Sequence, residues 1–325
     1  MAANTLSYRD TLRQTLIEEL DRDENVFLIG EDIGRYQGTF RVTAGLFDQY
    51  GARRVIDTPI TEPAIVGFAT GAAMTGLRPV VEMMTMSFSI LALDQIINHA
   101  AKIHYMTAGQ VSVPIVIRGP GGAANQLSAQ HSHSMEGWYA HVPGLKVVAP
   151  STPACAKGLL KSAIRDDNPV IFTESPGLYS IKGDVPEDPD FTIPFGLARV
   201  AKEGADVSLI AYSRMVHVCM AAADKLASDG IDAEVIDVRS LLPLDTKTIY
   251  NSVGKTHRAV VVYEDWRSGS FGAEIASRIS EDCFDDLDAP VLRVGGLNTP
   301  MPYTRVLELQ CIPNESDVIT AVHSL

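Results

Sequence analysis

One acidic residue, Glu62, stands where an extended segment meets a helix, and a carboxylate in that place could support acid–base chemistry. The preceding Arg54-Val55-Ile56 is typical of a short strand, and Pro59 keeps Thr58 extended. Pro63 suits the first position of a helix, so Glu62 should lie at a helix N-terminus, where the dipole favours a negative charge. Glu62 is therefore a candidate wall residue of a binding site. The alternative is a first-turn glutamate that only complements the dipole.

The helix expected over residues 63–77 is unusually rich in glycine and alanine. Its glycines lower the helix propensity of the segment. The small residues are Gly67, Gly71, Ala72, Ala73 and Gly76. Such a composition is useful where another backbone must pack closely against the helix.

A histidine pair and an aromatic residue are further candidates. His131 and His133 are two residues apart and could bind a metal from one strand face, but no third ligand is apparent nearby. Ordinary loop histidines or a catalytic histidine are the alternatives. Phe88 separates a strand from a helix expected over 89–106. It could stack on a flat ligand ring, although an aromatic in such a place is more often part of the core.

Two glycine-containing segments follow strands. Gly119-Pro120-Gly121-Gly122 is either a ligand loop or a plain mobile loop, because it lacks the GxGxxG pattern. Ser268-Gly269-Ser270-Phe271-Gly272 is close to the GxSxG nucleophile elbow, but its first glycine is replaced by Ser268. A helix N-terminus capped by serine is the alternative for that segment.

Bulk properties limit the class of protein. The chain has 325 residues, a formal net charge of −13 and four well-separated cysteines, without a CxxC pair. The negative charge argues against a nucleic-acid partner, and the cysteines favour buried thiols in a reducing compartment. No apolar run is long enough to span a membrane. The first 24 residues lack the features of a signal or transit peptide. We therefore expect a cytoplasmic protein, or a matrix protein if a transit peptide has been removed.

Short, continuously apolar segments alternate with helical patterns, which indicates an α/β fold with parallel sheets buried on both faces. The expected strands are 26–30, 54–56, 80–81, 115–117, 147–148, 170–172, 207–211, 233–237, 259–263 and 291–294. The expected helices are 7–20, 63–77, 89–106, 154–165, 216–227 and 271–279. The acidic, proline-rich segment 183–199 is the best linker candidate. The sequence thus predicts two doubly wound domains, 1–182 and 200–325.

Taken together, these segments resemble the β subunit of the E1 component of 2-oxo acid dehydrogenase complexes, which are transketolase-like thiamine enzymes. The resemblance rests on the order of motifs along the chain. They are Gly30-Glu31-Asp32, 58–62, 71–79, 114–119, Gln130-His131-Ser132, 143–148, 157–169 and 237–245. It implies a pyrimidine-binding domain followed by a transketolase C-terminal-like domain that serves interaction and assembly.

The resemblance implies a role for each candidate residue. Glu62 matches the glutamate that hydrogen-bonds the aminopyrimidine ring of thiamine diphosphate, and Phe88 matches the aromatic residue packed on that ring. Ile60 and Met84 match the apolar neighbours of the ring. His131 matches an active-site histidine that faces the substrate and the lipoyl arm, and Glu31 matches an acidic residue in the tunnel between paired sites. A potassium site is implied at four positions, which are Ile115, Ala163, Asp166 and Asn168.

The family pattern also identifies a partner. Thiamine enzymes hold the diphosphate through Mg²⁺ on a Gly-Asp-Gly motif, which this chain lacks. An α subunit should therefore supply the diphosphate and Mg²⁺ half of the site in an α2β2 heterotetramer. The product would pass to the lipoyl acyltransferase E2, in the step that forms acetyl-CoA after glycolysis.

Residues 83–88 resemble pyruvate-type subunits more than branched-chain ones, so the resemblance implies a pyruvate dehydrogenase (acetyl-transferring) activity. Branched-chain 2-oxo acid and acetoin complexes remain alternatives. A non-catalytic scaffold of a multi-enzyme core is an alternative of another class. A nicotinamide-linked oxidoreductase is disfavoured, because GxGxxG with a downstream ribose-binding acid is missing.

Overall fold

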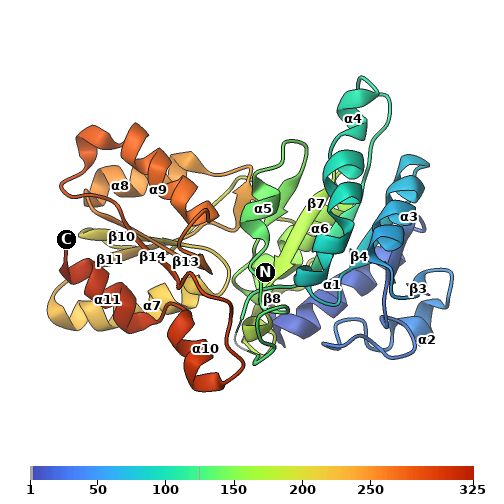
Figure 1. Cartoon of the computed structure of the whole chain (residues 1–325), viewed down its shortest axis with the longest axis horizontal. Coiled ribbons are helices and arrows are strands. Elements are labelled where there is room, and N and C mark those ends of the chain that lie inside the picture. The colour runs from blue at the N-terminus through green and yellow to red at the C-terminus, as the bar shows by residue number, and fades with distance from the viewer. Residues whose placement is uncertain (1–2, 124) are drawn as a thin grey trace.

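The computed structural model describes residues 3–123 and 125–325. Figure 1 shows two α/β halves side by side, with the N-terminal half in blue to green and the C-terminal half in yellow to red. Within the described residues no helix is both long and apolar enough to cross a membrane. The predicted fold class, two transketolase-like α/β domains, is confirmed.

The first half is built on a seven-stranded sheet of order β12-β6-β7-β5-β4-β2-β3. Six strands are parallel, and only β12 is antiparallel to its neighbour β6. In sheet order they are β12 (Ser240–Leu242), β6 (Lys146–Val148), β7 (Val170–Glu174), β5 (Val116–Pro120), β4 (Arg78–Glu82), β2 (Val26–Gly30) and β3 (Val55–Asp57). The strands expected from apolar runs are all present, because a parallel sheet covered on both faces needs such runs.

Helices cover both faces of this sheet. The side chains of α1 (Tyr8–Arg22) and α6 (Pro153–Arg165) pack on one face. The other face is covered by α3 (Glu62–Met74), α5 (Glu136–Ala140) and irregular turns at 86–100. The shorter α2 (Leu46–Tyr50) and α4 (Ile103–Met106) lie in the connections. Ser7 caps α1, and its hydroxyl accepts the backbone N–H of Asp10 at 3.1 Å.

The second half has a five-stranded sheet of order β14-β13-β10-β11-β9, with only β9 antiparallel. Its strands are β9 (Arg199–Lys202), β10 (Val207–Ala211), β11 (Ala233–Asp237), β13 (Ala259–Trp266) and β14 (Leu292–Gly296). Its helices are α7 (Met215–Leu226), α8 (Thr246–Thr256), α9 (Phe271–Asp282), α10 (Arg305–Cys311) and α11 (Glu315–His323). Short 3₁₀ turns occur at Ala227–Asp229 and Phe284–Asp286, and another, Pro176–Leu178, follows β7 in the first half.

The prediction of one continuous helix over 89–106 is wrong. The chain forms a 3₁₀ turn at Met86–Ala92, a π turn at Gln95–Ala100 and then α4. The Ser89 hydroxyl donates to the Met86 carbonyl at 2.5 Å, so a side chain takes an acceptor that a regular helix would use. Likewise α3 ends at Met74, before the expected Leu77, because Gly76 adopts φ of +99° and terminates it.

The expected linker 183–199 is largely packed against the first half. Its first residues belong to β8 (Lys182–Pro186), which pairs antiparallel with β1 (Ala3–Ser7). Farther along, the Ile193 N–H donates to the Gly158 carbonyl of α6 at 3.1 Å. After β11 of the second sheet, the chain returns to the first sheet, where β12 pairs with β6. The two halves therefore share one sheet edge, and a single apolar cluster runs from α3 to Tyr263 and Phe271.

Candidate active site

Glu62 lies at the carboxyl edge of the first sheet. Strand β3 ends at Asp57, and the Thr58 N–H then donates to the Gly30 carbonyl at the end of β2, at 3.0 Å. Thr61 precedes α3, so Glu62 is its first residue. Its side chain is only 6% exposed, and no hydrogen-bond or ion-pair partner is recorded for it among residues 3–123 and 125–325. The carboxylate of this largely buried residue is therefore open to a ligand or to a second chain.

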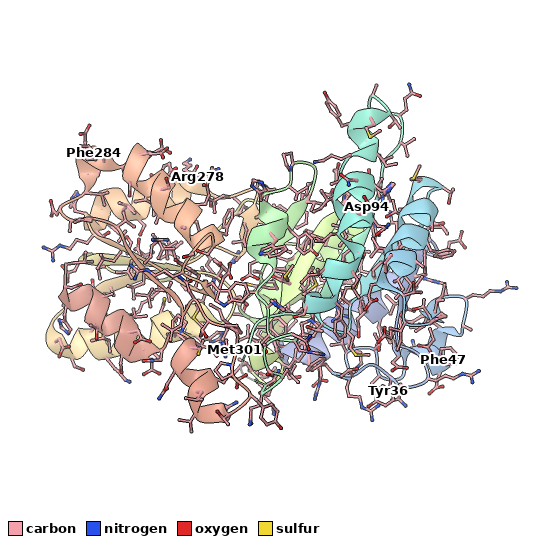
Figure 2. The ribbon with its side chains drawn as sticks, in the orientation of Figure 1. Tyr36, Phe47, Asp94, Arg278, Phe284 and Met301 are labelled. Atoms are coloured by element: carbon pink, nitrogen blue, oxygen red, sulfur yellow. The ribbon has the colours of Figure 1, made fainter. Side chains whose placement is uncertain are left out.

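Glu31 directly follows β2, and its carboxyl group is close enough to Glu62 for their charges to interact. Burial raises the pKa of Glu31, and the negative charges of Glu62 and Asp32 raise it further. The segment after Glu31 is fixed by Asp57, whose carboxylate accepts the N–H groups of Gly34 at 2.6 Å and Arg35 at 2.9 Å. Figure 2 labels Tyr36 and Phe47 of the segment that follows, below α3 in this view. Two acidic groups thus share the carboxyl ends of β2 and β3.

Phe88 and His131 form a second pair, next to α3. Their rings meet edge to face with centroids 5.1 Å apart. Phe88 is in the 3₁₀ turn Met86–Ala92, which packs on α3, and it is only half-buried, so part of its ring remains available. The core interpretation of Phe88 is therefore incomplete. His131 belongs to the segment 121–135 between β5 and α5, which we call the histidine loop.

The two apolar candidates differ in exposure. Met84 is half-buried just after β4, whereas Ile60 is 78% exposed immediately before α3. An aliphatic side chain so exposed at the mouth of a site contributes little to the packing of its own chain. The structure thus places Glu31, Ile60, Glu62, Met84 and Phe88 along the carboxyl ends of β2, β3 and β4.

A buried charge network under this edge was not expected from the sequence. The Arg118 guanidinium donates to Glu174 at 2.5 and 2.7 Å and also to Glu82, and the Tyr179 hydroxyl donates to Glu174 at 2.7 Å. Burial alone would lower the pKa of Arg118, but the two carboxylates raise this pKa well above its usual range. The three charged residues come from β5, β4 and β7, so the network ties together the strand ends that carry the site.

The sequence held a signal for this network, because Glu82 and Arg118 directly follow apolar strand residues and Glu174 follows another such run after Thr173. Charged residues at the ends of neighbouring buried strands meet at one edge of the sheet. The contacts of His133 were also not predicted from the sequence. Its ring nitrogen lies 3.0 Å from the Ser87 hydroxyl, and its ring packs edge-on against Trp266 at 5.8 Å.

The other candidates have ordinary explanations. Ser270 caps α9 by accepting the Ala273 N–H at 3.2 Å, which confirms the helix-start interpretation of 268–272. No group of three or more His, Cys, Asp or Glu side chains suited to a metal occurs in the described part of the chain. The first two residues of the glycine segment 119–122 are the end of strand β5, which runs to Pro120.

The four potassium candidates lie together near the amino ends of β5 and β7, at the opposite edge of the sheet from Glu62. Asn168 donates to Asp166 through its backbone N–H at 2.8 Å and its side chain at 2.9 Å, and the Ile115 carbonyl accepts the Val170 N–H. Lys146 also pairs with Asp166. Despite burial, these donors lower the pKa of Asp166. A cation there would share Asp166 with an ammonium group, so the potassium site stays a prediction.

The arrangement suits one kind of ligand. An unpartnered carboxylate could accept a hydrogen bond from a nitrogen heterocycle, a half-exposed aromatic ring could pack on that heterocycle, and an imidazole beside the ring could exchange protons with a reacting group. One wall of such a site is present, formed by α3, the turn at 86–92 and the histidine loop.

Comparison with known proteins agrees with this geometry. Residues 4–182 match the family described as transketolase, pyrimidine binding domain, and residues 196–318 match the transketolase C-terminal domain. The chain is 50% identical to the mitochondrial pyruvate dehydrogenase E1 component subunit beta of Caenorhabditis elegans, over 99% of this chain and 92% of that one. It is 50% identical to the corresponding subunit of Rickettsia conorii, over 98% and 97% of the two chains.

Two further comparisons agree. The corresponding subunit of Rhizobium meliloti is 49% identical over 99% of this chain and 70% of its own length. A solved structure, described as a split-gene transketolase in an inactive β4 tetramer, superposes with a TM-score of 0.79 at 23% identity, over 98% and 97% of the two chains. At that identity the superposition supports the fold alone. The chain therefore belongs to the family of pyruvate dehydrogenase E1 β subunits, with transketolase-type pyrimidine-binding and C-terminal domains.

Proposed function

We propose that this chain supplies the pyrimidine half of a thiamine diphosphate site in an E1 enzyme that decarboxylates pyruvate and transfers the acyl group to the lipoyl arm of E2. The observation that carries the proposal is the Glu62 carboxylate, 6% exposed and without a recorded partner among the described residues, beside Phe88 and His131. Homologues named as pyruvate dehydrogenase E1 β subunits support the reaction class.

The residues present fit the pyrimidine ring of the cofactor. Glu62 would accept a hydrogen bond from a ring nitrogen, and Phe88 with Met84 would pack on the ring. When bound, thiamine diphosphate supplies the carbon nucleophile that attacks the 2-oxo group. His131 would face the reacting carbon and move protons there, and Glu31 would share the acidic environment of Glu62.

The other half of the site should come from an α subunit. The outer side of α3 is apolar and open, with Phe68 60% exposed, and the adjacent turn exposes Leu91 to 61%. A Cβ atom added at Gly71 would meet no atom within 4 Å, so packing within this chain does not require that glycine. A partner that approaches α3 closely explains both observations. Mg²⁺ would be held by that partner, because this chain has no Gly-Asp-Gly motif.

The test uses Glu62→Gln in the enzyme reconstituted with an α subunit. We expect thiamine-dependent turnover to fall by at least about 10²-fold, the scale of general acid–base contributions, while assembly is kept. Glu315→Gln is the matched control, because Glu315 is also a first-turn helix glutamate, in α11. If Glu62 only complements the helix dipole, both variants will keep near-wild-type kcat, and the proposal fails.

A binding measurement tests the divided site. Calorimetry on the chain alone should detect no Mg²⁺-dependent binding of thiamine diphosphate, whereas the reconstituted complex should bind it. Tight binding by the chain alone would overturn the proposal that a partner supplies the diphosphate half. A complex without thiamine-dependent turnover would favour the scaffold alternative.

A further inference from the structure

The histidine loop is held by carboxylates from the other half of the chain. The structure describes its residues 121–123 and 125–135. The Ala123 N–H donates to Glu264 Oε1 at 2.5 Å, and the Gln126 N–H donates to Glu308 Oε1 at 2.9 Å. Glu264 belongs to β13 and Glu308 to α10. Two elements of the C-terminal half therefore bind the backbone of a loop of the N-terminal half.

Both carboxylates are well placed to hold a loop. Glu308 is 0% exposed, and Glu264 is fixed by an ion pair with Arg214 at 2.8 Å. Hydrogen bonds from backbone N–H groups to ionised carboxylates are about twice as strong as those between neutral groups. In Figure 1, α10 lies below the second sheet, on the side that faces the first half, and Figure 2 places Met301 in the segment that leads into it.

The loop backbone is shaped to meet these acceptors. Gly122 has φ of +83°, and a Cβ atom there would lie 2.4 Å from Glu264 Oε1. The Gly122 N–H also closes the base of the loop by donating to the His133 carbonyl at 2.8 Å. Gln126 and Ser128 have φ of +56° and +65°, conformations that are costly for residues other than glycine. A loop with such a backbone needs external hydrogen bonds to keep one conformation.

Consecutive residues at the end of β13 contact the same region. Glu264 binds the start of the loop, and Trp266 packs edge-on against the His133 ring at its end, with centroids 5.8 Å apart. The Asp265 carboxylate faces α5, where a Cβ atom added at Gly137 would lie 3.4 Å from it. The pairing of β13 with β14 shifts register between Val262 and Trp266, which lets neighbouring residues point to different partners.

We propose that Glu264 and Glu308 are positioning residues for His131, so that the C-terminal half sets the place of the histidine loop in the active site. The proposal rests on the proposed function, because it assigns to His131 a role in that reaction. The two carboxylates would not touch substrate or cofactor. They would act through the backbone of the loop, and their loss would increase the number of conformations that His131 samples.

Amide hydrogen exchange measures the loop without relying on activity. In the full chain carrying Glu308→Ala, peptides covering 121–135 should exchange at least about tenfold faster than in the wild type, the effect expected from one hydrogen bond to a charged group. Glu308→Gln keeps an oxygen acceptor and should restore most of the protection. Glu281→Ala is the control, because Glu281 is an exposed carboxylate bonded to Ser277 within α9, and it should leave the loop unchanged. Unchanged loop exchange in Glu308→Ala would overturn the proposal.

Half-reaction kinetics in the reconstituted enzyme test the connection to His131. Glu308→Ala should slow lipoyl acylation by at least about tenfold more than it slows decarboxylation, and Glu308→Gln should recover most of that loss. In a His131→Ala background the same change should cause no further loss, because the two residues act as one unit. An additive loss, or an equal loss in both half-reactions, would overturn the positioning role.

The two proposals fail in different ways. A wild-type complex without thiamine-dependent turnover would refute the proposed function, and the exchange experiment would still show whether Glu308 holds the loop. Wild-type turnover with a normal loop in Glu308→Ala would refute only the positioning role.

Discussion

Two buried carboxyl groups, one from each half of the chain, repel each other near the end of the histidine loop, and replacing one of them should stabilise the protein at alkaline pH. Glu136 is 8% exposed at the start of α5, and Asp265 is 6% exposed near the end of β13. Burial, followed by the charge of Asp265, raises the pKa of Glu136 to about 8 from its ordinary 4.5. Burial is also the main cause that raises the pKa of Asp265 to about 6.

The sign follows from proton binding. Between pH 4.5 and about 8 the folded chain keeps a proton on Glu136 that the unfolded chain has released, so the free energy of unfolding falls as pH rises through this window. Each unit of pKa difference corresponds to about 1.4 kcal/mol, and the two acids titrate as a pair. We expect Glu136→Gln, which cannot ionise, to raise the free energy of unfolding by about 2–4 kcal/mol at pH 8.5. At pH 5 it should have little effect.

Urea denaturation across pH 5–9 provides the measurement, with tryptophan fluorescence as the probe. The chain has two tryptophans, and both adjoin the pair, since Trp138 is in α5 and Trp266 follows Asp265. Glu274→Gln is the control, because Glu274 is an exposed residue paired with Arg278. A wild-type stability that does not decrease between pH 5 and 8.5, or a Glu136→Gln variant with the wild-type slope, would refute this reasoning.

Three further predictions concern the proposed enzyme. His131→Ala should slow reductive acylation of the lipoyl group more than decarboxylation, measured as separate half-reactions, and an equal loss in both would indicate a structural role. Gly71→Leu should weaken assembly with the α subunit in sedimentation experiments, whereas Gly71→Ala should stabilise α3 of the free chain by up to about 1 kcal/mol; normal assembly of Gly71→Leu would place the partner elsewhere. Pyruvate should be the best substrate and 2-oxobutyrate a weaker one, with branched-chain 2-oxo acids poorer by at least about tenfold in kcat/KM. A preference for 3-methyl-2-oxobutanoate, or activity on acetoin alone, would contradict that order.

The elements that carry the site could be predicted because their signals are local. Apolar runs marked β2, β4 and β5, and the proline pair around Glu62 marked the start of α3. Parallel strands place their carboxyl ends at one edge, so the residues that follow them had to be neighbours. Glu31, by contrast, became a site candidate only through the family resemblance, and the pairing of β2 with β3 explains why it lies beside Glu62.

The features that escaped prediction depend on contacts between distant segments. The β1–β8 ladder joins residues nearly 180 positions apart, such as Thr5 and Asp184, and neither strand is long or strongly apolar. The bond from the Gln126 N–H to Glu308 likewise spans 182 positions. Nothing in the local composition of α10 distinguishes Glu308 from a solvated glutamate. The prediction of a helix over 89–106 failed for another reason. The Ser89 hydroxyl donates to a backbone carbonyl there and so competes with the hydrogen bonds of the regular helix that the apolar residues suggest.

Two observations on α3 have one physical explanation. Glu62 is a largely buried residue at the start of the helix, and none of the described residues forms a hydrogen bond or ion pair with its carboxylate, which leaves that group open to a ligand. Farther along the same helix, Gly71 lowers helix propensity, although a Cβ atom would fit there. Packing within this chain explains neither the open carboxylate nor the glycine. A ligand at the first position and a closely packed α subunit at the second make both useful, which is why we place the missing half of the site across the outer face of α3.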